Sequence, residues 1–502
     1  MTGCPSLPDV NPLLEGLAPF IPFSRVPEAL LNEPLQFVPW RTMTPELREQ
    51  FLASYKQHFF PTSFGIDVVT RIQIAVRHGL DLRDPRSPAE QKRINQLLMV
   101  DLDHPDILPS LTNPAMGGII DGWTGSGKSS LVTRVLNVIA PDQIIRHPKS
   151  KACGWSTLMQ ITYLYLDFPS NGTRGGLVAR ILGAIDALIG TNYVERSRRL
   201  RNLDSSLIFV MQMLSMHRIG VLVIDEGQPE TLDRSPWHRE LVQFFLALLN
   251  LGIPVILCGQ PRAFENFQRS AQVSRRFCEI GHFELRRADS DTHEWWRKEF
   301  VRGMMRFSLC EQVLDRDEIM RESRHTAAGV PGYFARQWIE AQRIALRKGG
   351  SKATLGLSDF HAGAQSPEIA KIAKAARWLE AGGPDDFEYD DLERRPMVKA
   401  AAVSSPTVAQ SEPPRQPPSK NDVVDQLRGN LERRTKQGTV ARNCTAKLAV
   451  SADPDDLRFN RAINILAGLE KSQKDLPLTP PEGHVDAQED SSSVRSTGTK
   501  QR

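Results

Sequence analysis

The chain has 502 residues, of which 40% are hydrophobic and 24% charged, with a formal net charge of +4. These are ordinary values for a globular protein of two or three domains, and the small net charge offers no general attraction to nucleic acid. Six cysteines without CxxC spacing predict a reduced, cytoplasmic chain with no zinc site. The N-terminus lacks a basic stretch followed by an unbroken apolar one, so neither a signal peptide nor a membrane span is expected.

The N-terminal part of the chain divides by composition. Residues 1–42 form a proline-rich arm, which either extends to dock on another molecule or packs on its own domain. Residues 43–110 contain apolar residues at three- and four-residue steps, as in PELREQFLASYKQHFF and IDVVTRIQIAVRHGL. This spacing predicts a helical lead-in to the main domain.

An α/β core is predicted over residues 111–288. Apolar runs without strict alternation suit strands that are buried on both faces, and the helical segments between them imply parallel pairing. The sequence therefore predicts a parallel sheet of five strands, at residues 117–121, 161–167, 220–226, 254–259 and 282–285.

The C-terminal part is predicted to be a helical lid and extension over residues 289–395, followed by a largely disordered tail over 396–502. Two tail segments, NDVVDQLRGNLERR and DDLRFNRAINILAGLEK, have helical periodicity. They either fold on a partner or form transient helices without one.

The stretch DGWTGSGKSS (121–130) fits the phosphate-binding pattern GxxxxGK[ST] and lies between a predicted strand and a predicted helix. Glycines let backbone N–H groups turn toward phosphate oxygens, and the helix N-terminus adds positive potential. Lys128 is expected to reach the β- and γ-phosphates of ATP, and Ser129 to bind Mg²⁺. The alternative is a glycine-rich turn with a chance lysine. The nucleotide-contacting residues are predicted to be Gly122, Trp123, Thr124, Gly125, Ser126, Gly127, Lys128, Ser129 and Ser130.

The stretch VLVIDEGQ places two carboxylates at the end of a buried strand. Asp225 is predicted to hold the Mg²⁺ shell, and Glu226 to orient a water for attack on the γ-phosphate. A water-orienting glutamate at this place favours hydrolysis over phosphoryl transfer to another substrate.

Three later features resemble the AAA+ class of ATPases. Gln260 follows the fourth predicted strand, where that class carries a residue that senses the γ-phosphate; an ordinary turn residue is the alternative. Arg275 and Arg276 precede the fifth strand, the usual place of an arginine that completes a neighbouring subunit's site, although a solvated basic turn would look the same. Arg336 is the candidate for the second sensor, in the lid.

Over residues 60–345 the chain resembles the TnsC/TniB-type AAA+ ATPases of bacterial transposons, and TnsC most closely. The resemblance rests on FGIDVVTRIQIAVRHGLDLRDP, YLYLDFPSNGTRGGL, ALIGTNY, GVLVIDEGQ, GIPVILCGQP and SRRF, which occur in the family's order. It implies an ATP-dependent regulator that assembles on double-stranded DNA as a ring or helical filament, without sequence preference. It also implies two further partners, a target-site selector and transposase subunits, and no membrane.

The resemblance places DNA contacts at the two ends of the helix after the second strand, at Thr173, Arg174, Thr191 and Asn192. Independently of the family, the run ERSRRLR brings Arg196, Arg198 and Arg199 together with Arg201 just downstream. Such a run would bind phosphates without reading sequence, although a solvated helix face is the simpler explanation. The helix between the two ends is apolar on one face, which predicts that this face is core.

Two other kinds of function remain open at this point. One is a AAA+ motor or remodelling ATPase that acts on DNA or protein, for which an aromatic pore loop would be the signature; none is evident after ITYLYLD. The other is a scaffold that binds ATP without turnover, against which the intact Asp225–Glu226 pair argues.

Overall fold

A computed structural model of the chain describes residues 11–381, except 103–108, 110–113, 229–231, 233–234, 265–266 and 268–270. The chain divides into two units, Met1–Lys399 and Ala400–Arg502, and all of the described residues belong to the first. The predicted disordered tail at 396–502, with its two helix-prone segments, lies outside the described residues.

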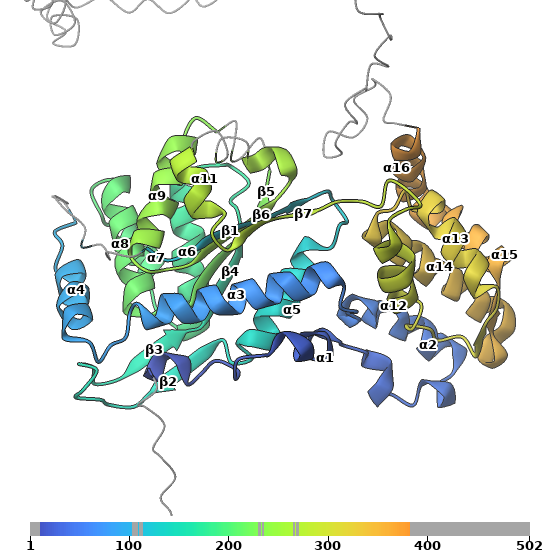
Figure 1. Cartoon of the computed structure of the whole chain (residues 1–502), viewed down its shortest axis with the longest axis horizontal. Coiled ribbons are helices and arrows are strands. Elements are labelled where there is room, and N and C mark those ends of the chain that lie inside the picture. The colour runs from blue at the N-terminus through green and yellow to red at the C-terminus, as the bar shows by residue number, and fades with distance from the viewer. Residues whose placement is uncertain are drawn as a thin grey trace, which may run out of the picture. The chain divides into compact units, whose positions relative to one another are not determined.

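A five-stranded sheet in the order β4-β5-β6-β1-β7 forms the centre of the first unit (Figure 1). Every neighbouring pair is parallel. This confirms the predicted α/β class and the five-stranded parallel sheet of a P-loop NTPase core. The strands are β1 (Gly117–Gly122), β4 (Tyr163–Asp167), β5 (Val221–Gly227), β6 (Val255–Gly259) and β7 (Gly281–Leu285).

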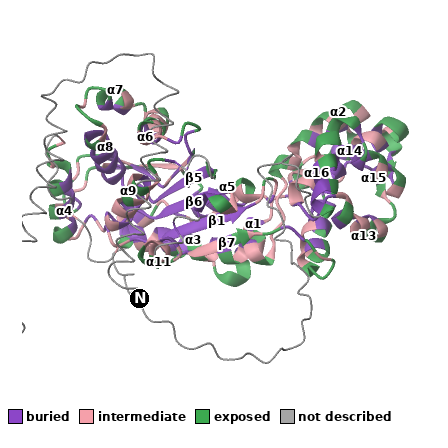
Figure 2. Cartoon of the chain, turned by 90° about the horizontal axis from the view of Figure 1, so that it is seen from above, coloured by how far each residue is buried: buried purple, intermediate pink, exposed green. Residues whose placement is uncertain are grey.

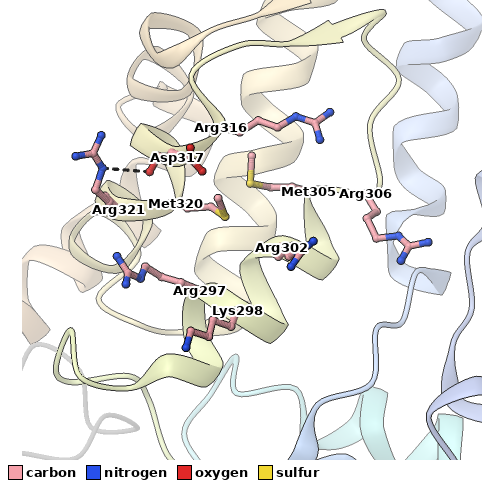
Figure 3. A pocket seen from close by; sticks show the side chains of 9 residues that line it. All are labelled: Arg297, Lys298, Arg302, Met305, Arg306, Arg316, Asp317, Met320 and Arg321. Atoms are coloured by element: carbon pink, nitrogen blue, oxygen red, sulfur yellow. Dashed lines mark hydrogen bonds between the residues drawn. The ribbon is translucent and has the colours of Figure 1, made fainter.

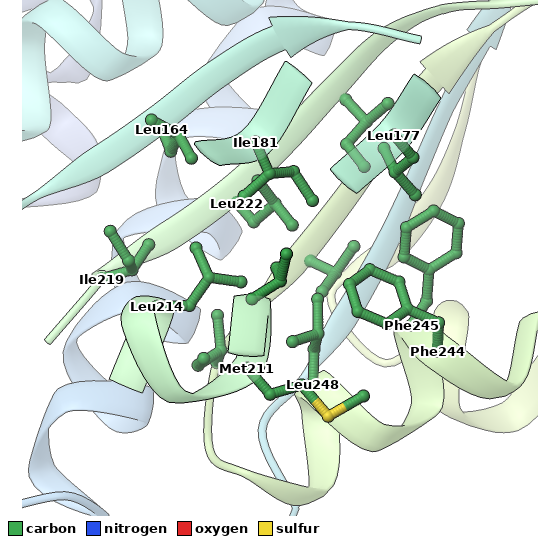
Figure 4. Packing of buried hydrophobic residues seen from close by; sticks show 14 of the residues in the cluster. Leu164, Leu177, Ile181, Met211, Leu214, Ile219, Leu222, Phe244, Phe245 and Leu248 are labelled. Atoms are coloured by element: carbon green, nitrogen blue, oxygen red, sulfur yellow. The ribbon is translucent and has the colours of Figure 1, made fainter. Parts of the chain in front are cut away.

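Helices cover both faces of this sheet, because successive strand residues point to opposite sides. On one face, Leu222 and Ile224 pack with the buried stripes of α6 (Arg174–Ile189), α8 (Leu203–Met216) and α9 (His238–Asn250) (Figure 4). On the other face, Val221 and Val223 pack with α3 (Ser63–Asp81) and α5 (Lys128–Ile139). The three inner strands, β1, β5 and β6, are therefore buried on both sides (Figure 2), which is why their sequences are apolar without alternation, whereas the edge strands β4 and β7 are only partly buried.

The strand predicted at 161–167 was wrong in its boundaries, because the run belongs to two strands. Ile161 ends β3 (Leu158–Ile161), which pairs with β2 (Ile144–His147) in an antiparallel sheet, and β4 starts at Tyr163. Thr162 separates them, since its N–H and hydroxyl both donate to carbonyls of residues 142–143 instead of joining a strand ladder. The β2–β3 hairpin was not predicted.

The described part of the N-terminal arm packs on its own domain. Leu13, Leu17, Val26 and Leu30 are buried against α3 and α5. The Asn11 side chain donates to the carbonyl of Leu80 at 3.0 Å. Of the two possibilities left open for this segment, the structure has the packed one. The arm contains the helix α1 (Val26–Leu30), and the lead-in that follows it contains α2 (Pro45–Phe51), α3 and α4 (Pro88–Leu98).

The helical region after β7 has a core of its own, built around Trp296, Phe334 and Trp338. It begins with a π-helical segment, Trp296–Val301. Its other elements are α12 (Arg302–Met304), α13 (Arg316–Thr326), α14 (Pro331–Gly349), α15 (Leu357–Ala364), α16 (Ala370–Glu380) and the short strands β8 (Gln312–Val313) and β9 (Thr354–Leu355). The sequence predicted a helical lid here; residues 382–395 of its predicted range lie outside the described residues.

Two more helices, α7 (Tyr193–Ser197) and α11 (Ala271–Phe277), belong to the α/β core. Short 3₁₀ turns occur at Pro12–Leu14, Phe23–Arg25, Pro34–Phe37, Trp40–Thr42, Leu52–Gln57, Pro261–Phe264, Gly350–Lys352 and Pro367–Ile369. Among the described residues, no helix combines the length and the apolar character needed to cross a bilayer.

Candidate nucleotide-binding site

The loop between β1 and α5 has the backbone that a phosphate cradle needs. Gly125 and Gly127 have φ of 85° and 94°, a region that residues with a side chain rarely adopt. Gly122 is required for a different reason, because a Cβ there would lie 2.7 Å from the carbonyl oxygen of Leu285 on β7. The glycines of the motif therefore serve both the turn and its close packing on the sheet.

Lys128 and Ser129 begin α5 directly after this loop. The Lys128 Nζ donates to the carbonyls of Gly122 at 2.7 Å and Trp123 at 3.1 Å, so the amine is folded back over the loop. Burial lowers the pKa of this amine, although Asp225 and other nearby acidic groups oppose the shift. The Ser129 Oγ donates to the Asp225 carboxylate at 2.6 Å, which brings the two predicted Mg²⁺ ligands together across 96 residues of sequence.

Asp225 is almost fully buried, at 2% exposure, and its carboxylate accepts three hydrogen bonds. Besides Ser129, the donors are the Tyr165 hydroxyl at 2.5 Å and the backbone N–H of Glu226 at 2.8 Å. Burial and the bond to Asp225 raise the pKa of Tyr165, so the phenol stays protonated and keeps donating. Tyr165 belongs to β4 and was missed by sequence reasoning, since an aromatic residue in a strand normally signals only β-propensity.

Glu226 lies at an irregularity in the sheet. The pairing register of β5 with β6 shifts between Ile224 and Gly227, and Glu226 has a φ of 59°. A glutamate in this left-handed region costs about 1 kcal/mol, and such strain is commonly stored at functional sites. The shift turns the exposed Glu226 out of the regular strand while Asp225 stays buried.

Gln260 and the two arginines lie at opposite ends of the parallel strands. A Cβ on Gly117, the first residue of β1, would lie 2.9 Å from the Arg276 carbonyl oxygen, whereas Gln260 lies past the carboxyl end of β6. Gln260 follows β6, is half-buried, and donates its backbone N–H to the carbonyl of Gly227 at 2.8 Å. Arg276, on α11, is hydrogen-bonded to the Asn250 side chain at the end of α9. Arg275 is exposed, and no hydrogen bond or ion pair to another described residue holds its guanidinium group.

The lid touches the phosphate loop through the start of α14. The Gly332 N–H donates to the carbonyl of Gly125 at 2.7 Å. Trp123 of the loop packs beside Val330 and Tyr333, and the Arg287 guanidinium lies 5.5 Å from the Trp123 ring centre. Arg336, the predicted second sensor, is on α14 and exposed. The contact between the start of α14 and the phosphate loop was not predicted.

A second hydrogen-bonded pair that sequence reasoning missed lies at the end of β1, directly before the phosphate loop. Asp121, which precedes Gly122 at the end of β1, is hydrogen-bonded to the His282 Nε2 on β7 at 2.7 Å. This bond raises the pKa of His282, against the effect of partial burial. The parallel register sets Asp121 opposite Glu284, and the sequence contains no signal for the pair.

The residues predicted to contact DNA occupy three different environments. Thr173 caps the N-terminus of α6, and Arg174 pairs with Asp204 at 3.1 Å while stacking over Trp237, so both have structural partners. Thr191 donates to Asp186, and Asn192 is exposed beside it.

The arginines downstream of the helix differ in their surroundings. Arg196 lies over the rings of Tyr193 and Phe209. Arg198 and Arg199 are 73% and 76% exposed and share Glu195 as an ion-pair partner.

The α6 residues between these ends are core, as predicted. Leu177, Val178, Ile181, Leu182 and Ile185 are buried. Leu188 and Ile189, which the sequence also placed on this face, are only partly buried and pack at its margin.

The residues at the loop fit a nucleoside triphosphate with Mg²⁺. The Ser126 Oγ is buried and has no hydrogen-bond partner in the described part of the chain, and the Lys128 amine is satisfied only by loop carbonyls. Ser129 and Asp225 offer one hydroxyl and one carboxylate, the kind of donor set with which Mg²⁺ completes its shell from phosphates and water. The fold and this site define the core as a AAA+-type P-loop ATPase.

The sequence profile of a family described as "AAA domain" matches residues 113–267, which contain the loop, Asp225 and Gln260. No curated protein sequence matches the chain significantly. The family match covers less than a third of the chain, so it indicates a AAA-type domain within residues 113–267 and assigns the whole chain to no family.

Solved structures with a detectable likeness have low similarity. The Orc1 protein of Aeropyrum pernix, in complex with DNA, has 13% identity over 55% of this chain and 65% of its own, with a TM-score of 0.34. A Walker-type ATPase of Pyrococcus abyssi has 16% identity over 59% and 76%, with a TM-score of 0.31. Domain III of the Thermotoga maritima replication initiation protein DnaA has 14% identity over 55% and 91%, also with a TM-score of 0.31. This chain spans just under two thirds of the Orc1 protein, and similarities this low assign no function to it.

Proposed function

We propose that this protein is an ATP-dependent, DNA-binding AAA+ regulator of DNA transposition, which assembles on duplex DNA and hydrolyses ATP to reset the assembly. The observation that carries the ATPase part is the cluster at Asp225. Its carboxylate is fixed by Ser129, Tyr165 and the Glu226 N–H, directly beside an exposed glutamate held out of the strand.

Bound Mg²⁺–ATP would supply the electrophilic γ-phosphorus and the leaving group. Ser129 and Asp225 would hold the metal, and Lys128 would turn from the loop carbonyls toward the phosphates. Glu226 would accept a hydrogen bond from the attacking water and so orient it. Gln260 and Arg336 are the proposed γ-phosphate sensors.

Self-assembly is supported by the exposed Arg275, whose guanidinium group no other described residue of its own chain holds. AAA+ hydrolysis benefits from an arginine supplied in trans, worth roughly 10³ to 10⁵ in rate. Arg275 is the better candidate, since Arg276 is already bonded to Asn250 within its own chain. A site shared between subunits would make turnover slow until the oligomer, a ring or a helical filament, has formed.

DNA binding is supported by Arg198 and Arg199, whose exposed guanidinium groups share one carboxylate between two positive charges. Together with the exposed Asn192 and Arg201 they form a surface suited to phosphates and not to base edges. The part in transposition, with a target-site selector and transposase subunits as partners, rests on the resemblance of the quoted motifs to TnsC/TniB-type proteins.

A second candidate shares the same core. The AAA-domain match also suits a AAA+ motor or remodelling ATPase acting on DNA or protein. For that function, hydrolysis would drive continuous movement, and would not end with release of the assembly.

One experiment separates the candidates. ATP hydrolysis is measured with and without duplex DNA, and the products are imaged by electron microscopy. The proposed switch requires DNA-stimulated hydrolysis and ATP-dependent assemblies on DNA that disperse as ATP is consumed. Monomers with undiminished ATPase activity in the absence of DNA would sink the proposal, and ATP-driven displacement of a bound strand or protein would favour the motor. Addition of transposase subunits to the assemblies then tests the transposition part separately.

A further inference from the structure

A strongly basic pocket of about 740 Å³ lies within the lid, between the π-helical segment with α12 on one side and α13 on the other (Figure 3). The cations that line it are Arg297, Lys298, Arg302, Arg306, Arg316 and Arg321, against one lining carboxylate, Asp317. Like charges brought together in this way repel one another unless an anion balances them. The pocket therefore fits a ligand with several negative charges.

Half of the lining cations are already balanced. Lys298 pairs with Glu294, Arg306 with Glu33 and Arg321 with Glu318. Within the described part of the chain, no hydrogen bond or ion pair holds the guanidinium groups of Arg297, Arg302 and Arg316, and all three residues are exposed. These three have donors to offer an incoming carboxylate or phosphate, for which the arginine fork is well shaped.

The wall between the arginines is apolar. Met305 is buried and Met320 half-buried, and Figure 3 shows their side chains between Arg316 and Arg302. Methionine is flexible and makes favourable contacts with aromatic rings. A bare phosphate backbone would leave these thioethers unmatched, whereas a peptide that alternates acidic and aromatic residues would match both the arginines and the methionines.

The chain contains such a peptide directly after α16. Residues 385–393 read DDFEYDDLE, in which six carboxylates alternate with Phe387, Tyr389 and Leu392. This segment lies outside the described residues, and it matches none of the sequence motifs described above.

The point at which the described chain ends places this segment within reach of the pocket. Glu380, at the end of α16, is bonded to Arg324 of α13 at 3.0 Å. Arg321, Met320, Asp317 and Arg316 precede Arg324 by three, four, seven and eight residues, so they share its face of the helix. The pocket thus runs along α13 from the anchored Glu380 for about 12 Å. The five residues from Glu380 to Asp385 span up to about 17 Å when extended.

We infer that the acidic segment 385–393 binds in the basic pocket of its own lid. Its carboxylates pair with Arg297, Arg302 and Arg316, and its aromatic side chains pack on Met305 and Met320. The inference concerns the lid alone and does not depend on the proposed role in transposition.

Zero-length cross-linking of the full-length protein with a carbodiimide tests the inference, because the reagent joins a lysine amine only to a carboxylate in direct contact. The variant Arg302→Lys/Arg316→Lys keeps the pocket's charge and adds two amines to that of Lys298. The Lys298–Glu294 pair, at 2.7 Å, reports that the chemistry works. Lys352, an exposed lysine of the lid outside the pocket, reports random encounters.

The expected result, by mass spectrometry, is a set of cross-links from residues 385–393 to positions 298, 302 and 316 in protein of single-chain mass. These should be lost when the six carboxylates are converted to amides. They should persist in a matched control that neutralises an acidic cluster further along the tail, Asp453, Asp455 and Asp456→Asn.

Several results would overturn the inference. One is a working Lys298–Glu294 cross-link with no link to the segment, and another is equal linkage of the segment to Lys352. Links found only in a species of twice the mass would assign the pocket to a second copy of the chain. Loss of the pocket links on addition of duplex DNA, with weaker DNA binding by Arg302→Ala/Arg316→Ala, would assign it to nucleic acid.

Discussion

The Asp225 carboxylate is the residue around which the candidate site is organised. It accepts from Ser129 on α5, from Tyr165 on β4 and from the neighbouring backbone N–H, so three elements fix its orientation before any ligand binds. A carboxylate oriented in advance spends little free energy on ordering when Mg²⁺ arrives. The Glu226 side chain beside it is exposed and has no hydrogen bond to another described residue, which suits a group that must meet a water.

Replacing the glutamate separates ATP binding from hydrolysis. Glu226→Gln keeps the size of the side chain but removes the carboxylate that orients water, so hydrolysis should fall roughly 10²-fold or more while ATP binding persists. ATP-bound assemblies should therefore remain on DNA, which is measured by their dissociation rate after dilution. Glu279→Gln, at an exposed glutamate outside the site, is the matched control. Dissociation at the wild-type rate would contradict the role given to Glu226.

The Asp121–His282 pair predicts a dependence of stability on pH. The pKa of His282 is raised in the folded protein above its unfolded value of about 6.5, with Glu284 also favouring the charged form and Arg286 opposing it. The pair's contribution is therefore complete below about pH 6.5 and is lost as the pH rises through the folded pKa. The free energy of unfolding of wild type and His282→Asn, measured in urea, should differ more at pH 5.5 than at pH 8.5. An equal difference at both pH values would show that the histidine acts through packing alone.

Among the elements, α14 links the lid to the phosphate loop by a contact that has no room for a side chain. A Cβ on Gly332 would lie 2.9 Å from the Gly125 carbonyl oxygen. Gly332→Ala should therefore push α14 away from the loop and weaken nucleotide binding, measured by titration with a fluorescent ATP analogue. Gly349→Ala, at the other end of α14, has its nearest neighbour at 3.5 Å and serves as the control. If both variants bind nucleotide like wild type, the lid contact does not act on the site.

For the whole molecule, the proposed oligomer predicts that two inactive chains can restore activity together. Arg275→Ala leaves a chain with an intact phosphate loop but no arginine for its neighbour. Lys128→Ala leaves a chain with a damaged loop that still offers Arg275 to its neighbour. An equimolar mixture should hydrolyse ATP faster than either variant alone, because some sites then combine an intact loop with an intact arginine. Arg276→Ala should instead lower stability through the lost bond to Asn250. A mixture with no more activity than its components would argue against Arg275 as the residue that acts in trans.

DNA binding by the assembled protein should depend on salt through the exposed arginines. Arg198→Ala/Arg199→Ala should lower affinity about equally for unrelated sequences, and should reduce the slope of log affinity against log salt by about 2, as two phosphate contacts are lost. Arg25→Ala, at an exposed arginine of the N-terminal segment, is the control. An unchanged slope would mean that this basic run is only a solvated surface.

The sequence by itself determined the α/β class, four of the five central strands to within one residue, the helical lid and the ATPase class. These depend on local signals: apolar runs long enough to be buried on both faces, and a motif whose spacing is set by the loop it forms. It could not determine where the run at 161–167 divides, because Thr162 leaves the strand only through bonds to residues 142–143.

The tertiary structure alone decided which residues support the site. Tyr165 is 60 residues from Asp225, His282 is 161 residues from Asp121, and Gly332 reaches Gly125 from a separate helical region. Nothing in the sequence assigns Tyr165, His282 or Gly332 to the site, and each gains its partner only through sheet order or lid docking. The tertiary structure also brings together the charged residues of the basic pocket from two helical segments of the lid. In the sequence, each of these segments has the charge pattern of an ordinary solvent-exposed helix. The physical reason is the same in each case: spacing along the sequence reports which face of an element is buried, but the partner of a polar side chain depends on which elements meet.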